Sequence, residues 1–238
     1  MEAFAGVDAR SAEAVVATAP PDGGTDPVLP AHGEALARGR LRHAIYLSST
    51  GIYGGRAGAW VDEATEPRPM QPRNAARLAV ERQWAALAPA AGVDLCRVAG
   101  IYGPGRSAID ELRAGRGRRI DRPGHVFSRI HRDDIARAVV AALSRPPAGL
   151  SVLHFADDLP AEPRAVTEEA ARLLGMAPPP LLPFAEAARA MSPMALGFWA
   201  ENRRVSSAAT KAALGISWSY PDYRAGLSAI FREERSFL

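Results

Sequence analysis

The feature that most constrains this chain is a repeated change of pattern, in which short apolar runs alternate with longer stretches of helical periodicity. Four apolar runs predict buried strands, at 14–20, 43–49, 93–101 and 151–156. Helical stretches separate or follow them, in the later part of 26–39 and at 73–92, 107–115, 132–145 and 162–175. Strands that alternate with helices need crossover connections, so the pattern predicts a doubly wound α/β domain with a mostly parallel sheet. A brief further strand is expected at 126–130.

After about residue 178 this alternation stops. A proline-rich turn at 177–184 is followed by three short helical stretches, around 184–200, 205–214 and 222–234. We therefore expect a main domain over 1–178 and a small helical lobe over 179–238 that does not fold independently.

Composition excludes several classes of protein. Cys96 is the only cysteine, so no intramolecular disulfide can form, which suits a reducing cytoplasm. The first ten residues carry Glu2 and Asp8 and do not resemble a secretory signal, and no apolar stretch is long enough to span a bilayer. The formal charge of +3 is too small to predict nucleic-acid binding, although all but one of the 29 basic residues are arginine.

The chain has no glycine-rich phosphate loop between an early strand and helix. The sequence GIYGPG at 100–105 follows a strand, but its spacing is wrong and Pro104 interrupts it. The residues alone leave two readings open: the protein does not bind a dinucleotide, or the segment that would bind it is not in this chain.

Five motifs in a fixed order resemble a known family. YLSSTGIYG at 46–54 is followed by WVDEATEPRP, an alanine-rich helix, RVAGIYGPGRS and RIHRDDIARAV. This series resembles the extended, atypical short-chain dehydrogenases/reductases of the NAD(P)-dependent epimerase/dehydratase group. The resemblance runs from about residue 14 to the end. It implies a Rossmann-type fold that here lacks its N-terminal glycine-loop βαβ segment.

The resemblance also implies catalytic positions. The family uses a Ser or Thr with a Tyr-x-x-x-Lys pair, and these positions fall on Ser49, Arg73 and Arg77. Arginine does not donate a proton near neutral pH, because its pKa lies above about 12. Tyr46, Tyr53 and Tyr102 are candidate substitutes that nothing in the sequence positions.

The same resemblance implies binding residues for NAD or NADP and for a small substrate. The cofactor side comprises Thr18, Ala19, Pro20, Ser48, Ile101, Tyr102, Gly103 and Pro104. The substrate side comprises Thr50, Tyr53, Arg106 and Arg119. The family commonly dimerises through the helix resembling 73–91, which favours a homodimer.

Each motif also has a purely structural interpretation. Ser49 can cap the end of its strand, and Arg73 with Arg77 can form a solvated helix face instead of an anion clamp. The seven arginines between 113 and 132 suit a phosphate-binding patch or a solvated loop. His131 and Asp134 are expected to support a helix start and not to bind a metal.

Three functional hypotheses follow. The first is an NAD(P)-dependent epimerase/dehydratase-like oxidoreductase acting on a sugar-like or nucleotide-sugar-like small molecule in the cytoplasm. The second is a non-catalytic member that binds a dinucleotide or a partner protein, because the Tyr-x-x-x-Lys pair and glycine loop are absent. The third is a truncated product that folds only with a partner, because an open sheet edge would be exposed.

Overall fold

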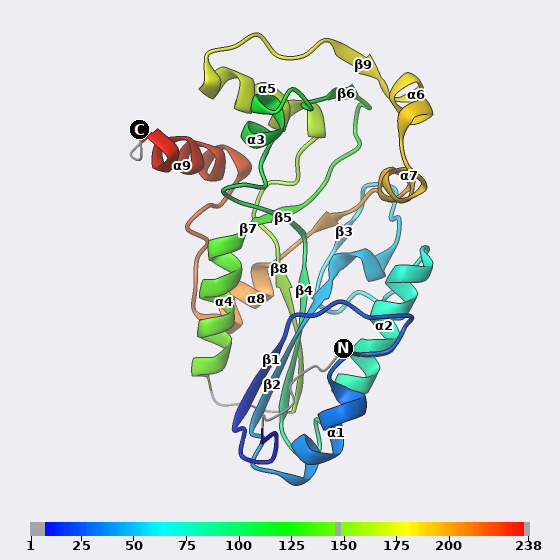
Figure 1. Ribbon diagram of the computed structural model, residues 1–238, viewed down its shortest axis with the longest axis vertical. Coiled ribbons are helices and arrows are strands. Elements are labelled where there is room, and N and C mark those ends of the chain that lie inside the picture. The colour runs from blue at the N-terminus through cyan, green and yellow to red at the C-terminus, as the bar shows by residue number, and fades with distance from the viewer. Residues whose placement is uncertain (1–7, 146–148, 236–238) are drawn as a thin grey trace.

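The computed structural model describes residues 8–145 and 149–235, so the reading of residues 1–7 as non-secretory lies outside it. Its centre is a parallel sheet of four strands (Figure 1). The strands lie in the order β1 (Ala14–Ala17), β2 (His43–Ser49), β4 (Gly92–Val98) and β8 (Leu150–Phe155). No helix within the described ranges has the length and apolar content that crossing a membrane requires.

Helices cover both faces of this sheet (Figure 1). On one face, α1 (Leu29–Arg38) and α2 (Pro72–Ala85) pack on Ala44 and Tyr46 of β2. On the other, α4 (Arg132–Ser144) packs around Ile45. Successive residues of a strand point to opposite faces, so β2 contributes to two separate cores. The predicted doubly wound α/β fold is therefore confirmed.

The predicted strand at 93–101 is divided between two sheets. β4 ends at Val98, and β5 (Gly100–Tyr102) pairs in parallel with β7 (Arg129–His131), which is the brief strand expected at 126–130. At the junction, the Ala99 amide still bonds to the carbonyl of Phe155, whereas the Gly100 amide bonds to that of Ser128. The chain thus changes its pairing partner within one residue.

Helix α2 is shorter than the predicted 73–92. It ends at Ala85, and tight turns continue to Ala91, whose amide bonds to the Leu87 carbonyl. Pro89 has no amide hydrogen to give and disfavours helical geometry at the residue before it. Leu87 and Ala91 are nevertheless buried against the sheet, because the turns keep them on the core side.

The helical lobe lies at the carboxyl end of the sheet (Figure 1). It is built from chain on both sides of residue 178, since β6 pairs with β9 and α3 packs on α5 and α9. Its elements are α3 (Ala108–Arg113), β6 (Arg119–Asp121), α5 (Pro163–Leu174), β9 (Leu181–Pro183), α6 (Phe184–Ala187), α7 (Pro193–Ala200) and α9 (Tyr223–Arg235).

The chain returns to the sheet after α7. The short strand β10 (Arg204–Val205) pairs with β3 (Trp60–Val61), and α8 (Ala208–Leu214) packs on β8. A 3₁₀ turn, η1 (Thr50–Tyr53), follows β2 directly. These connections place residues near 50 and near 200 on opposite walls of the same space.

Candidate active site

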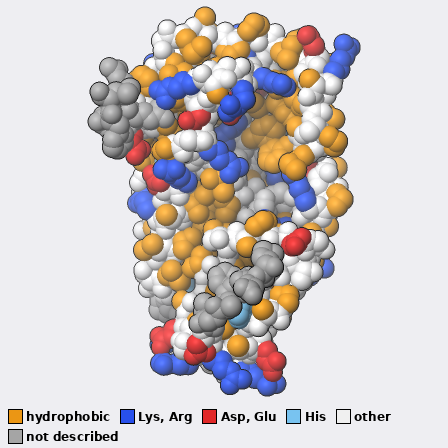
Figure 2. All heavy atoms as spheres, in the orientation of Figure 1, with side chains coloured by type: hydrophobic (Ala, Val, Ile, Leu, Met, Phe, Trp, Pro, Cys, Tyr) orange, Lys and Arg blue, Asp and Glu red, His pale blue; other side chains and the backbone are white. Residues whose placement is uncertain are grey.

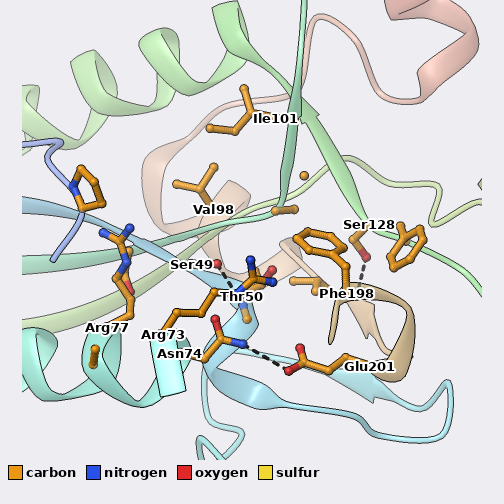
Figure 3. A pocket seen from close by; sticks show the side chains of 18 of the residues that line it. Ser49, Thr50, Arg73, Asn74, Arg77, Val98, Ile101, Ser128, Phe198 and Glu201 are labelled. Carbon is orange, nitrogen blue, oxygen red and sulfur yellow. Dashed lines mark hydrogen bonds between the residues drawn. The ribbon is translucent and has the colours of Figure 1, made fainter. Parts of the chain in front are cut away.

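A cavity of about 750 Å³ lies between the carboxyl ends of the parallel strands and the helical lobe (Figure 3). Its walls come from the loop after β1, the end of β2, the start of α2, the β4–β5 junction and the segment after α7. Open parallel sheets bind ligands at this edge, and the volume falls within the roughly 300–1,000 Å³ of small-molecule sites. We call this cavity the central pocket.

The sheet contributes hydroxyl groups to the central pocket. Ser49 is the N-cap of η1, and its Oγ accepts a hydrogen bond from the Gly51 amide at 3.1 Å. That bond leaves the hydroxyl hydrogen of Ser49 available to a ligand. Ser48 also lines the pocket, and its buried Oγ has no hydrogen-bond partner among the described residues.

Helix α2 contributes two guanidinium groups, from Arg73 and Arg77 (Figure 3). Arg73 lies over the Phe198 ring, with its Cζ 5.2 Å from the ring centroid. Arg77 donates to the Tyr46 hydroxyl at 2.9 Å and to the Leu47 carbonyl at 3.2 Å. Arg106 reaches the same cavity from the loop after β5. Within the described part of the chain, none of these three arginines has a carboxylate partner.

The lobe closes the pocket with residues that the sequence analysis did not single out. Glu201 follows α7, and its carboxylate accepts from Asn74 Nδ2 at 3.2 Å and from Arg203 at 2.7 Å. Ser128 accepts from the Val205 amide at 2.9 Å, which ties the wall beside Phe198 to β10. Only tertiary packing brings these residues together, because Asn74 and Glu201 are 127 positions apart.

The charged side chains that are described in the lining of the pocket are mostly basic. Burial, with Arg56 and Arg73 nearby, lowers the pKa of Arg203, while Glu201 raises it. Four arginines line the cavity, namely Arg73, Arg77, Arg106 and Arg203. Among the described residues only Arg203 of these four is paired with a carboxylate, so the remaining positive charge favours an anionic ligand.

The structure brings eight of the predicted site residues to the central pocket. They are Pro20, Ser48, Ser49, Thr50, Arg73, Arg77, Ile101 and Arg106. Thr18 and Ala19 precede the lining residue Pro20 but do not line the cavity themselves. The motifs at strand ends predicted the pocket residues that the sheet contributes, because parallel strands end at the same edge of a sheet.

The remaining predicted residues lie elsewhere. Tyr102 lines a smaller cavity of about 360 Å³ and donates to the Asp222 carbonyl at 3.3 Å. Gly103 pairs with Arg106 in a tight turn, and Pro104 accepts from Arg132. Arg119 is 2.6 Å from Glu168 in an ion pair. These four residues form local or tertiary contacts and do not line the central pocket.

Tyr53 belongs to a buried polar network beneath the pocket. Its hydroxyl lies 2.5 Å from His154 Nε2 and accepts from Arg97 at 2.6 Å. Arg97 also forms a bidentate ion pair with Glu81, at 3.2 and 2.9 Å. Burial raises the pKa of Tyr53 to about 12.

None of the three tyrosines proposed as substitute proton donors lines the central pocket. Tyr46 is fully buried and stacks on Trp84, and its hydroxyl receives the Arg77 hydrogen bond. Burial also raises the pKa of Tyr102. The positions that the family resemblance assigns to Tyr and Lys thus hold arginines, and no described tyrosine takes their place.

His131 caps the start of α4, and Asp134 joins the first turn of that helix to the segment at 219–220. The His131 side chain accepts from the Asp133 amide at 3.3 Å and caps the helix. Asp134 is fully buried and accepts from the amides of Ser219 and Tyr220, each at 2.9 Å. Their expected structural role is confirmed.

The surface of the molecule is hollowed on the face shown in Figure 2. Hydrophobic side chains form the walls of this hollow, and basic side chains lie near its rim. Phe198 is half exposed, which leaves an aromatic surface on the wall of the central pocket. A ligand there meets both apolar and positively charged groups.

Comparison with proteins of known sequence gives a partial match. No protein-family model matches the chain. Protein YeeZ of Escherichia coli strain K12 is 33% identical over 146 residues, which cover 61% of this chain and 50% of YeeZ. The chain spans about half the length of the curated relatives it matches.

Solved structures match over more of the chain. A conserved protein of unknown function from Silicibacter pomeroyi DSS is 41% identical, with a TM-score of 0.85 over 93% of this chain and 77% of that protein. A Methylobacillus flagellatus protein assigned to the NAD-dependent epimerases/dehydratases is 27% identical, with a TM-score of 0.62 over 87% and 70%. MoeE5, solved with UDP-glucuronic acid and NAD, is 22% identical, with a TM-score of 0.68 over 86% and 69%.

Proposed function

We propose that this chain, which shares the fold of NAD-dependent epimerases/dehydratases, is a member of the extended short-chain dehydrogenase/reductase family and acts as an NAD(P)-dependent oxidoreductase on a small, anionic, sugar-like substrate. Nucleotide sugars are the substrate class we favour. Support comes from MoeE5, which binds UDP-glucuronic acid and NAD on the same fold.

One observation carries this proposal: Arg73, Arg77 and Arg106 line a single cavity and have no carboxylate partner among the described residues. Guanidinium groups bind phosphate and carboxylate with two parallel hydrogen bonds, which makes them suited to a diphosphate. Exposed arginines elsewhere on the chain are commonly paired, as Arg116 is with Glu111. The positive charge of these pocket arginines is thus available to an anionic ligand, because no carboxylate among the described residues neutralises it.

The residues at the sheet edge fit an NAD(P)-type cofactor. Ser48 presents a buried hydroxyl oxygen without a partner, and Pro20 and Ile101 frame the adjoining wall. These residues and Ser49 would hold the cofactor, which when bound supplies the hydride-transfer chemistry of this family. Ser49 would orient a substrate oxygen through its available hydroxyl hydrogen.

A second candidate function is binding without turnover. None of the described residues that line the central pocket is a tyrosine, which favours this function because the family's usual proton donor is then missing from them. Binding of NADH or NADPH with no conversion of a nucleotide sugar would support this second function over the first.

The test combines binding and turnover. NADH and NADPH are titrated by fluorescence and UDP by calorimetry, and UDP-glucose is then supplied as substrate. The variant Arg73→Gln/Arg106→Gln should bind UDP about tenfold or more weakly, because charged hydrogen bonds contribute roughly 1.5–3 kcal/mol each. The variant Arg38→Gln/Arg172→Gln removes the same charge outside the pocket and should bind UDP normally. Equal binding by both variants, or no binding by the wild type, would contradict the proposal.

A further inference from the structure

A single carboxylate faces the positively charged central pocket. Among the described residues that line this cavity, Glu201 is the only acidic one, and its side chain is 6% exposed. Its carboxylate lies beside Asn74 and the Phe198 wall (Figure 3). Burying a carboxylate costs free energy unless it is paired, and Arg203 supplies the pairing charge for Glu201.

Groups on both sides hold this carboxylate in place. Asn74 donates from α2, and it is itself fixed because the η1 turn packs so closely on it: a Cβ added to Gly51 would lie 2.6 Å from Asn74 Oδ1. Arg203 donates to the other carboxylate oxygen and also to the Gly54 carbonyl, at 3.0 Å. The carboxylate of Glu201 therefore has a defined orientation before any ligand binds.

The Glu201 carboxylate can still accept hydrogen bonds from a ligand. A carboxylate has about four acceptor positions, and Asn74 and Arg203 occupy two of them. An ammonium ligand is disfavoured by the surrounding guanidinium groups, which repel a cation. A hydroxyl group is uncharged and donates one hydrogen, so it suits both the acceptor and the positive surroundings.

We propose that Glu201 is the specificity-determining residue that recognises the hydroxyl groups of a sugar ring, while the pocket arginines hold the anionic part of the same ligand. This inference rests on the proposed function and names the residue that selects the sugar. Phe198 and Phe127, whose ring centroids are 5.7 Å apart, provide an apolar wall beside Glu201 for the C–H face of the ring.

The test compares UDP-glucose with UDP, which differ by the sugar. In calorimetric titrations, Glu201→Gln should weaken UDP-glucose binding about tenfold or more, because an amide accepts less strongly and loses its charge. Binding of UDP should stay within about twofold of wild type. Glu169→Gln is the matched control, since Glu169 also pairs with one arginine, Arg172, but lies on α5 outside the pocket.

A purely structural role would weaken both ligands together and lower the melting temperature, so equal losses for UDP and UDP-glucose would overturn the inference. So would equal affinity of the wild type for the two ligands, although anion binding by the arginines would then still stand. Failure of the wild type to bind UDP would overturn the proposed function, and this inference with it. Should Glu201→Gln not fold, Asn74→Ala removes one of the two groups that orient the carboxylate and should show the same selective loss.

Discussion

At the scale of single residues, the buried network around Tyr53 shows how this chain tolerates charge in its core. Ser206 offers a carbonyl to His154 Nδ1 at 2.8 Å, so that nitrogen carries the hydrogen and Nε2 accepts from the Tyr53 hydroxyl. Burial lowers the pKa of His154, which keeps the ring neutral. Arg97 then donates to Tyr53 and to Glu81, so each member of the network has a partner.

Removing one charge from this network should be costly. Arg97→Met leaves the Glu81 carboxylate, 2% exposed, without its guanidinium and should lower the free energy of unfolding by roughly 3–5 kcal/mol. The double variant Glu81→Leu/Arg97→Met removes both charges and should recover most of that loss. Urea denaturation followed by circular dichroism measures both values, and a double variant no more stable than the single one would refute this reading.

Asp157 gives the stability of the protein a pH dependence. Burial raises its pKa to about 8, with Asp158 and Asp222 adding to the effect and Arg129 opposing it, and its buried Oδ2 has no partner among the described residues. In an unfolded chain the pKa of Asp is about 4. Between these values the native state keeps a proton that the unfolded state has lost, so stability falls as the pH rises from about 4 to about 8.

Asp157→Asn removes this titration. Its stability relative to wild type should therefore increase from about pH 5 to about pH 8, measured by urea denaturation at each pH. Asp22→Asn makes the same change at an exposed aspartate that has no ion pair among the described residues, and it serves as the control. A constant difference between Asp157→Asn and wild type across this range would show that Asp157 is ionised in the native state.

Only some residues of the central pocket could be predicted from the sequence. Ser49 and Ile101 are the last residues of two predicted strands, and parallel strands end at one edge of a sheet, so motif and topology together locate them. Glu201 and Arg203 follow an apolar helix in a proline-rich region, where no periodicity indicates which way a side chain points. Asn74 lies next to the predicted Arg73, but nothing in the sequence pairs it with a residue 127 positions away.

At the scale of elements, the accuracy of the predictions depends on where each helix or strand begins and ends. Apolar periodicity predicts both α1 and α4. Gly39 marks the end of α1, and the acidic residues of the first turn mark the start of α4. The bounds of both helices in the structure agree closely with these signals. The division of 93–101 into β4 and β5 was not predicted, because apolar composition does not show which neighbour a strand bonds to. The C-terminal end of α2 was predicted too late, because the effect of Pro89 on the helix was not taken into account.

The capping box of α3 provides a test at this scale. Ser107 Oγ accepts from the Asp110 amide, and the Asp110 carboxylate accepts from the Ser107 amide at 2.8 Å. Ser107→Ala should lower the free energy of unfolding by about 0.5–2 kcal/mol. Ser144→Ala, at the exposed end of α4, should change it by less than about 0.5 kcal/mol. Chemical denaturation that finds equal effects would remove the cap as an explanation.

At the scale of the whole molecule, the lobe and the sheet domain are interleaved along the chain. The pair β6–β9 and the contacts of α5 with α3 join segments from either side of residue 178, so one cut in the sequence does not separate the two parts. Strand–helix alternation predicted the sheet because it is a local signal. The assembly of the lobe depends on distant contacts, and the homodimer and the boundary at 178 stay predictions.

The walls of the central pocket span the chain from Pro20 to Val205. During synthesis, the cavity therefore cannot form before the chain as far as Val205 has left the ribosome. Until then the ends of the strands lack the segment that later covers them, which leaves apolar surface exposed to aggregation. Ligand capture thus requires that the segment around Val205 has docked on the sheet edge.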